Sequence, residues 1–404
     1  MRRKLKRKIT LYTVLFMFTM ITLLHIYINC RLNLNWNELP SGVHLIFWTV
    51  SSLTNVYNHG IQTSHGRRDP VIIYWTKVFR KPVKVGEKSW PYFYIGDSCP
   101  VKCTLTTDHN MINDASAIII HARNIEEMPQ KDKIQRKNIR WILHSNESPK
   151  FAPALSSAKI MAKFNFYLSY RLDSDFSLSL FPKPLLRPLP VPFAKKRKTL
   201  AAALYSHCEA VRTEYLVQLM KEIEIDSYGS CLHNTDLPDH IGPRDQQRFS
   251  NLSKPLVNLY KTYKFTIVFM NSDCDYFVDE KLYYALSAGS VPVFMGTAKI
   301  REYLPGNLRH SIIDVRDFPT PKALATYLKR LAKDEKAYNK FLRWKYEGFQ
   351  FPEGYTNSTI GQLWDSRLPV LCKICQKISS GDMGRDGLPV ETCERKNFSE
   401  WVEH

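Results

Sequence analysis

The stretch Tyr263–Gly296, YKFTIVFMNSDCDYFVDEKLYYALSAGSVPVFMG, decides the fold expected for this chain. Its apolar run Phe265–Phe269 has the length and composition of a buried strand. The acidic pair Asp279–Glu280 suits the positive first turn of a helix, and Gly289 suits its end. A second apolar run, Val291–Phe294, predicts the next strand. A strand, a polar loop, a helix and a strand in this order indicate an α/β fold that binds its ligand beyond the carboxyl ends of the strands.

Apolar runs alternate with helix-compatible stretches elsewhere in the chain, which indicates further α/β layers. A Pro-rich stretch (181–192), followed by the basic run Lys195–Lys198, has the composition of an interdomain linker. The chain is therefore expected to fold as two α/β domains with a cleft between them. It lacks GxGxxG and P-loop motifs, which argues against dinucleotide and ATP folds of those types. The other predicted elements are strands at Val71–Trp75, Ala117–Ile120, Arg140–Leu143, Leu200–Tyr205 and Ile225–Tyr228 and a helix over Ala210–Ile223.

The N-terminus has the pattern of a membrane anchor. Residues 2–8 carry six positive charges, and Ile9–Ile28 then continues for twenty residues without a charge. That length matches the ~20 residues that cross a bilayer. The basic block is expected to stay in the cytoplasm, which places the body of the chain in the lumen. The alternative is a cleaved leader, which gives the same compartment without the anchor.

The sequence beyond the anchor suits an oxidising, lumenal compartment. Eight of the nine cysteines follow Cys30, and an even number is typical of disulfide-bonded proteins. The formal net charge of +19 argues little for nucleic acid, which a lumenal protein does not meet. It is interpreted as favouring an anionic donor such as a nucleotide sugar, and the alternative, which accounts for most of the excess, is a basic, solvated surface with no single purpose. Sequons for N-glycosylation occur at Asn146, Asn251, Asn357 and Asn397.

Two regions resemble the α1,3-fucosyltransferases, glycosyltransferase family 10. Tyr263–Gly296 matches the family's donor-binding pattern YKF…FENS…DYITEKL…AL.AG.VPVV.G at about nineteen positions. The segments WILHSNESPK and FNFYLSYRLDSD, within Trp141–Asp175, resemble the family's W.....E.P and FN…SYR.DSD patterns. The resemblance extends more loosely over about residues 70–375. It implies a GT-B-like architecture of two Rossmann-like domains facing a cleft, here with an N-terminal transmembrane helix.

The resemblance also implies an order of segments along the chain. The expected segments are a cytoplasmic tail (1–8), the anchor (9–28), a stem (29–67), an acceptor-side α/β domain (68–190), a GDP-fucose-binding α/β domain (198–365) and a C-terminal disulfide-bearing tail (366–404).

The same resemblance assigns roles to individual residues. Glu147 aligns with the catalytic carboxylate, which as a general base takes the proton of the attacking hydroxyl. Glu280 is expected to accept hydrogen bonds from the ribose hydroxyls, and Lys281 to face the diphosphate. Arg212 matches an arginine placed on the phosphates, where a guanidinium fork suits phosphate oxygens. The implied donor-binding residues are Arg212, Asn271, Tyr276, Glu280 and Lys281.

No metal or other cofactor is expected. The sequence DSD at 173–175 looks like a metal-binding DxD motif, but in this family it follows SYR on the acceptor side and is interpreted as structural. The CxxC at 372–375 lacks the second pair that a zinc site needs. The family pattern instead pairs Cys372 and Cys375 with cysteines of the first domain, here Cys99 and Cys103. A further candidate pair is Cys208 with Cys231, which leaves Cys274 and Cys393.

Two departures from the family pattern bear on the acceptor. Met270 replaces a glutamate, and Asp279 replaces a threonine. They place the chain in a divergent branch described as protein O-fucosyltransferases of the endoplasmic reticulum. The expected function is thus inverting transfer of L-fucose from GDP-fucose to a Ser or Thr hydroxyl of a secreted protein, by an enzyme of the endoplasmic reticulum or Golgi membrane. Two alternatives stay open: α1,3-fucosylation of N-acetylglucosamine in N-glycans or lactosamine, and a catalytically inactive lumenal binding protein.

Overall fold

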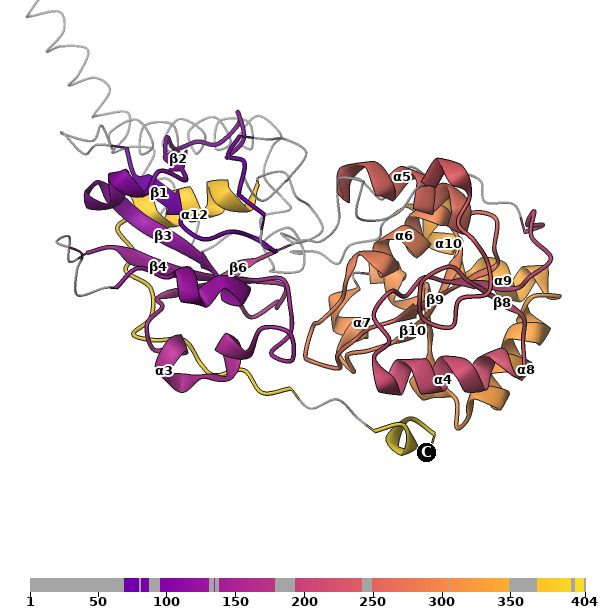
Figure 1. Cartoon of the computed structure of the whole chain (residues 1–404). Coiled ribbons are helices and arrows are strands. Elements are labelled where there is room, and N and C mark those ends of the chain that lie inside the picture. The colour runs from indigo at the N-terminus through magenta and orange to yellow at the C-terminus, as the bar shows by residue number, and fades with distance from the viewer. Residues whose placement is uncertain are drawn as a thin grey trace, which may run out of the picture. The chain divides into compact units, whose positions relative to one another are not determined.

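The computed structural model describes much of the chain beyond residue 68 (Figure 1). The described ranges are 69–79, 81–86, 95–130, 134, 138–178, 193–241, 249–304, 306–348, 369–393 and 397–402. All of them belong to one unit, Asp69–His404. The predicted tail, anchor and stem, most of the Pro-rich linker and the sequon at Asn357 lie outside these ranges. Within them, no helix combines the length and the apolar character that crossing a bilayer requires.

The first domain is built on a parallel sheet with the strand order β2-β1-β3-β4-β5-β6. Both faces are covered, so its central strands are nearly continuous apolar runs, such as AIII in β3. Short helices cover one face, and α12 (Val370–Ser379) covers the other. The strands are β1 (Val71–Tyr74), β2 (Thr104–Thr106), β3 (Ala115–His121), β4 (Arg140–Ser145), β5 (Phe166–Ser169) and β6 (Phe176–Ser177).

The second domain is built on another parallel sheet, with the order β11-β10-β9-β7-β8. Apolar side chains of α4 and α8 pack on one face of this sheet, and those of α5 and α6 pack on the other. The strands are β7 (Ala201–Ala203), β8 (Ile225–Ser227), β9 (Phe265–Phe269), β10 (Val291–Met295) and β11 (Ile313–Asp314). Two parallel sheets with helices on their faces confirm the predicted α/β class.

Helix α6 (Glu280–Ala288) has the boundaries that its sequence signals predict. Asp279 is the N-cap, and its carboxylate accepts a hydrogen bond from the main-chain N–H of Lys281. Gly289 ends the helix in the left-handed region at φ 64°, which glycine adopts without steric cost. The remaining α-helices are α3 (Ala158–Met161), α4 (Ala210–Met220), α5 (Phe249–Tyr260), α7 (Ile300–Tyr303), α8 (Pro321–Leu331), α9 (Glu335–Phe341) and α10 (Arg343–Glu347).

Short 3-10 helices occur in the connections of both domains. They are η2 (His109–Asn113), η3 (Ala122–Glu127), η5 (Pro153–Ser156), η6 (Asp239–Ile241), η7 (Gly306–His310), η8 (Val315–Asp317) and η10 (Ser399–Trp401). Of these, η3 matters most for function, because it follows β3 at the edge of the first sheet where the candidate site lies.

The C-terminal region, expected as a disulfide-bearing tail (366–404), contains a helix that packs on the first domain. Leu371, Ile374 and Ile378 of α12 pack into the apolar core on one face of the first sheet. Two disulfides, Cys99–Cys372 and Cys103–Cys375, hold the helix there. The chain therefore returns after the second domain to complete the first, because α12 needs an apolar surface on which to bury its own apolar side.

Two further disulfides involve the second domain. Cys208 pairs with Cys231, the further candidate pair, over a sequence separation of 23 residues. Cys274 pairs with Cys393 over 119 residues, and these are the two cysteines that the sequence left over.

Candidate active site

Glu147 lies just after β4, at the carboxyl edge of the first sheet. Ser145 fixes the backbone there, because its Oγ donates to the Glu147 carbonyl (2.8 Å) and accepts from the Glu147 N–H (3.2 Å). The carboxylate is 22% exposed and its Oε1 lies 3.9 Å from Nη1 of Arg123, in η3 after the neighbouring strand β3. Arg123 was missed in the sequence, although it lies two residues after the end of β3, as Glu147 lies two residues after the end of β4.

Burial raises the pKa of Glu147 to about 7. Arg123 and Lys281 oppose this shift by attracting the charged form, whereas Asp279 and Glu280 reinforce it by repulsion. The three residues from the start of α6 therefore lie close enough to Glu147 to influence its charge. A carboxylate with a pKa near 7 suits a general base, since about half of it is ionised at neutral pH and it still accepts a proton readily.

The N-terminus of α6 supplies an electropositive position beyond the carboxyl edge of β9. The helix dipole there favours an anion. Lys281 adds a full charge, and its Nζ lies 2.5 Å from the Asp279 carboxylate. Asp279 stands where the family has a threonine. It thus both caps the helix and neutralises the charge of Lys281. Glu280, the first residue of the helix, is partly exposed.

The loop 271–278, between β9 and α6, carries two more predicted donor-binding residues. We call it the donor loop. Asn271 accepts a hydrogen bond from Ser272 Oγ at 3.2 Å. Tyr276 adopts a left-handed φ of 62°, which is uncommon for a residue with a side chain. It is held there by hydrogen bonds from its N–H to Thr297 Oγ1 (3.2 Å) and from its hydroxyl to Glu302 Oε2 (2.9 Å).

Arg212 is buried near the start of α4 and contacts the backbone of the same region. Its guanidinium donates to the carbonyls of His207 and of Phe269, the latter at 3.3 Å, and lies 4.6 Å from the centre of the Tyr205 ring. Arg212 therefore anchors the end of β9 immediately before the donor loop. Its contact with phosphate stays a prediction.

Two polar contacts join the segment after Glu147 to the second domain. The buried Ser148 Oγ lies 2.6 Å from Ser272 Oγ in the donor loop. Lys150 Nζ lies 3.3 Å from the carboxylate of Glu209, which caps α4. The structure thus brings Glu147 together with the donor loop and the start of α6.

The Asn146 sequon does not suit a glycan in this fold. Asn146 Oδ1 accepts a hydrogen bond from His144 Nε2 at 2.5 Å, and Ser148 is fully buried. A glycan on Nδ2 of this half-buried asparagine would lie directly beside Glu147, so the structure argues against Asn146 as a modification site. Asn397 is exposed, as a glycosylated asparagine needs to be. The side chain of Asn251 is not among those that the structure describes.

The two carboxylates of the DSD sequence form hydrogen bonds and ion pairs with other residues of the chain. Arg171 makes a bidentate pair with Asp173 at 2.7 Å. Asp175 accepts from the N–H of Tyr167 at 2.8 Å and lies 3.2 Å from the guanidinium of Arg385. Over the described ranges, no group of three or more His, Cys, Asp or Glu side chains is arranged to hold a metal ion.

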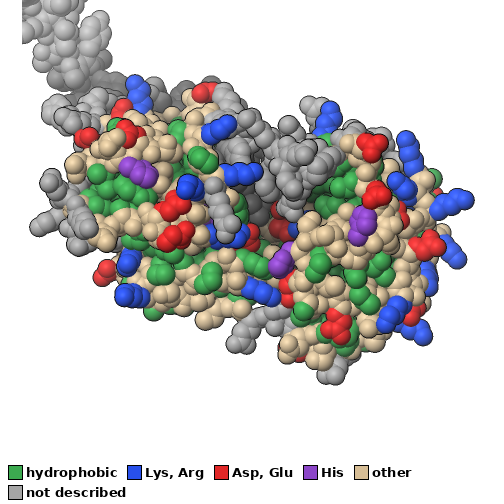
Figure 2. All heavy atoms as spheres, in the orientation of Figure 1, with side chains coloured by type: hydrophobic (Ala, Val, Ile, Leu, Met, Phe, Trp, Pro, Cys, Tyr) green, Lys and Arg blue, Asp and Glu red, His purple; other side chains and the backbone are tan. Residues whose placement is uncertain are grey.

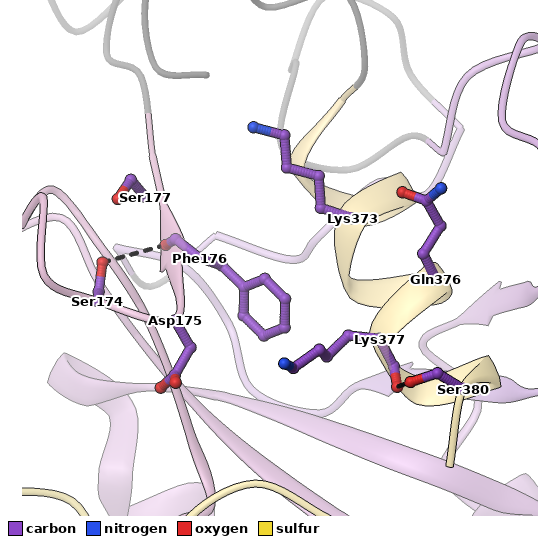
Figure 3. A pocket seen from close by; sticks show the side chains of 8 residues that line it. All are labelled: Ser174, Asp175, Phe176, Ser177, Lys373, Gln376, Lys377 and Ser380. Atoms are coloured by element: carbon purple, nitrogen blue, oxygen red, sulfur yellow. Dashed lines mark hydrogen bonds between the residues drawn. The ribbon is translucent and has the colours of Figure 1, made fainter. Parts of the chain in front are cut away.

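A pocket of about 480 Å³ lies beside this motif, and Glu147 is not among the residues that line it (Figure 3). It is lined by Ser174, Asp175, Phe176 and Ser177 on one side and by Lys373, Gln376, Lys377 and Ser380 of α12 on the other. On the face drawn in Figure 2, Lys and Arg side chains are interspersed with acidic residues on both domains. The excess positive charge is thus not confined to the candidate site.

Two family models match the parts of the chain that build this site. The model described as "Glycosyltransferase family 10 (fucosyltransferase) C-term" matches residues 194–386, and the one described as "Fucosyltransferase, N-terminal" matches residues 67–180. This chain belongs to glycosyltransferase family 10. The matched ranges contain Glu147, the donor loop and the start of α6.

Curated members of the family are similar over the same region. "GDP-fucose protein O-fucosyltransferase 3" of Danio rerio is 31% identical over 294 residues, which cover 69% of this chain and 60% of the relative. The Homo sapiens protein of that name is 30% identical over 292 residues (69% and 58%). "Alpha-(1,3)-fucosyltransferase B" of Drosophila melanogaster is 30% identical over 296 residues (68% and 65%). The match thus spans about three fifths of the length of these relatives.

Solved structures of fucosyltransferases are also similar. "Crystal Structure of alpha1,3-Fucosyltransferase" has a TM-score of 0.44 at 16% identity, and the match covers 72% of this chain and 85% of the solved chain. "Crystal Structure of alpha1,3-Fucosyltransferase with GDP-fucose" has a TM-score of 0.44 at 15% identity, with coverages of 81% and 95%.

Proposed function

We propose that the protein is an inverting fucosyltransferase of GT-B-like architecture that moves L-fucose from GDP-fucose to a Ser or Thr hydroxyl of a secreted protein. The observation that carries the proposal is the position of Glu147. Its carboxylate, with a pKa of about 7, lies within electrostatic range of the α6 N-terminus that bears Glu280 and Lys281. A base beside an anion-binding helix end is the arrangement that transfer from a nucleotide sugar requires.

A single displacement accounts for these residues. The acceptor oxygen forms a bond to the anomeric carbon as Glu147 takes the proton, and the bond from that carbon to the diphosphate breaks on the opposite face. The electron pair leaves with GDP, and the β-linked donor gives an α-linked product. Lys281 and the α6 N-terminus stabilise the charge on the departing diphosphate. The residues proposed to hold the donor are Arg212, Asn271, Tyr276, Glu280 and Lys281.

The proposed acceptor is a protein hydroxyl. Similarity to proteins named protein O-fucosyltransferase and the two departures beside the donor loop, Met270 and Asp279, support this choice. The similarity to proteins named α1,3-fucosyltransferase supports the second candidate, transfer to the 3-hydroxyl of N-acetylglucosamine.

Assays with purified lumenal protein and GDP-fucose distinguish these acceptors. We expect fucose on Ser or Thr of folded cysteine-rich domains, detected by mass spectrometry, and none on N-acetyllactosamine. Fucose on N-acetyllactosamine alone would replace the acceptor assignment. Absence of both transfer and donor hydrolysis would instead favour the inactive binding protein.

The protein is further proposed to be a single-pass type II protein of the endoplasmic reticulum or Golgi membrane with a lumenal body, and to need no metal. The basic block at 2–8 and the uncharged run Ile9–Ile28 support the anchor and its orientation. Protection of the body from protease in intact microsomes would support this topology, whereas digestion would exclude it. Loss of transfer in EDTA would exclude the metal-free mechanism.

The transfer rate is expected to fall below about pH 7, because protonated Glu147 no longer accepts the proton of the acceptor. This fall on the acid side, the acid limb, is measured in the pH profile of kcat/KM, which reports the pKa of Glu147 in the free enzyme. Arg123 lowers the pKa of Glu147, so the change Arg123→Gln raises this pKa and moves the limb to higher pH, by up to about 1 unit. Lys77→Gln is the control, since Lys77 pairs with Glu127 instead. Identical pH profiles for wild type and Arg123→Gln would refute the pairing.

A further inference from the structure

A C-terminal segment, residues 382–393, lies along the first domain and is coloured yellow in Figure 1. We call it the strap. The strap begins at Asp382, whose carboxylate lies 2.7 Å from Lys377 Nζ and whose carbonyl accepts from Arg140 Nε at 3.0 Å. Further along, the N–H groups of Arg385, Leu388 and Glu391 donate to the carbonyls of Asn165 (2.9 Å), Met161 (3.1 Å) and Leu155 (2.9 Å).

The strap lies so close to the first domain that a side chain would not fit at one of its positions. A Cβ added to Gly384 would lie 2.6 Å from the carbonyl oxygen of Asn165. Arg385 also makes the ion pair with Asp175, so the second aspartate of the DSD sequence holds the strap. These contacts make the strap an ordered part of the first domain.

The end of the strap is bonded to the second domain. Cys393 forms the disulfide with Cys274, which lies between Asn271 and Tyr276 in the donor loop. A covalent bond therefore links a segment that is fixed on the first domain to the loop that follows β9. The family model ends at residue 386, so neither Glu391 nor Cys393 is within the part of the chain that it matches.

The buried carboxylate of Glu391, in the strap, contacts two residues of the first domain close to the donor loop. Glu391 is 7% exposed, and its Oε2 accepts from the Tyr170 hydroxyl at 3.4 Å. Its Oε1 lies 4.0 Å from Nε of Arg171, and burial raises the pKa of this carboxyl. The Tyr170 ring meets Phe277 of the donor loop edge to face, with 5.0 Å between ring centres.

Residues of the first domain thereby enter the core of the second. Tyr170 belongs to the same buried cluster as Cys274 and Phe277, and Cys393 packs against it. The donor loop is thus held toward the first domain by the disulfide, by the Tyr170 ring and by the hydrogen bond between Ser148 and Ser272.

We propose that the strap positions the donor loop for transfer, with Cys393 and Glu391 as positioning residues. The inference rests on the proposed function. Glu147 is on the first domain and the donor-binding residues are on the second, so the reaction depends on how firmly the two are held together. An error of about 1 Å in such a distance can lower a rate about 100-fold. Glu391 acts through Tyr170, and Cys393 acts through Cys274.

The test removes the disulfide in the lumenal protein with Cys274→Ser, Cys393→Ser and the double variant. The donor-binding residues remain but two of them are on a less ordered loop, so GDP affinity by titration calorimetry is expected to fall by only a few-fold, whereas kcat falls about 10- to 100-fold. Hydrogen exchange of residues 271–278 is expected to become faster. Thr392→Ala is the matched control, because Thr392 is exposed between the two positioning residues.

Two further variants distinguish positioning from general stabilisation. Glu391→Ala should lower kcat and speed exchange in the donor loop, and Glu391→Gln should recover most of both, because the amide oxygen still accepts from Tyr170. A lower melting temperature with unchanged kcat and loop exchange, in all variants that fold, would overturn the proposal. If the wild type does not transfer fucose, the proposed function fails, but hydrogen exchange still decides whether the strap orders the loop.

Discussion

Replacing Glu147 with Gln is expected to lower kcat for fucosyl transfer by about 10²- to 10⁴-fold, the range in which a general base contributes. The amide has nearly the shape of the carboxylate but cannot take a proton at neutral pH. GDP affinity should stay within about 3-fold of wild type, because the predicted nucleotide contacts are on the second domain. Initial rates with GDP-fucose and acceptor, together with titration calorimetry using GDP, measure both quantities.

Glu126→Gln is the matched control for this experiment. Glu126 is an exposed glutamate of η3 in the same domain, so its neutralisation changes net charge equally without touching the site. It should leave kcat unchanged. An equal loss in the two variants would mean that net charge, rather than a base at Glu147, controls the rate.

Replacing Lys281 with Ala is expected to weaken GDP binding by about 10- to 100-fold, since a hydrogen bond to a charged group contributes about 1.5–3 kcal/mol. Only 15% of the Lys281 side chain is exposed, at the positive end of α6, so bulk water screens its attraction for phosphate only in part. KM for GDP-fucose should rise with the Kd for GDP. Calorimetry and donor-saturation kinetics provide the two values.

Asp279→Asn is the informative companion to Lys281→Ala. Asparagine caps a helix about as well as aspartate, so α6 should keep its N-terminus. The change removes the carboxylate that now pairs with Lys281 and competes with the diphosphate. GDP should therefore bind at least as tightly as in the wild type. Weaker binding in Asp279→Asn, with Lys281→Ala unchanged, would mean that Asp279 rather than Lys281 meets the nucleotide.

Much of the candidate site could be predicted because its signals are local. The donor loop follows a five-residue apolar strand, and α6 begins at a capping aspartate and ends at a glycine, so each boundary depends on neighbouring residues. Glu147 was identified by the same kind of short pattern. The contribution of Arg123 was missed, because its importance comes from the pairing of β3 with β4, which brings together residues 24 positions apart.

The protonation of Glu147 could not be predicted at all. Its pKa depends first on burial, and then on charges from β3 and from α6, which meet only in the folded chain. The short strands β2, β5, β6 and β11 were also missed. They have two to four residues each, too few for a clear periodic pattern.

The amino-acid sequence by itself determined the α/β class, the central strands of both sheets, the helix that begins at Glu280 and membership in the fucosyltransferase family. These depend on apolar runs, caps and motifs whose parts are adjacent in the chain. Only the tertiary structure decided that α12 completes the first domain, that Cys274 pairs with Cys393, and that Glu391 accepts a hydrogen bond from Tyr170. Those contacts join residues 119 to 273 positions apart, and their partners are selected by packing rather than by neighbouring sequence.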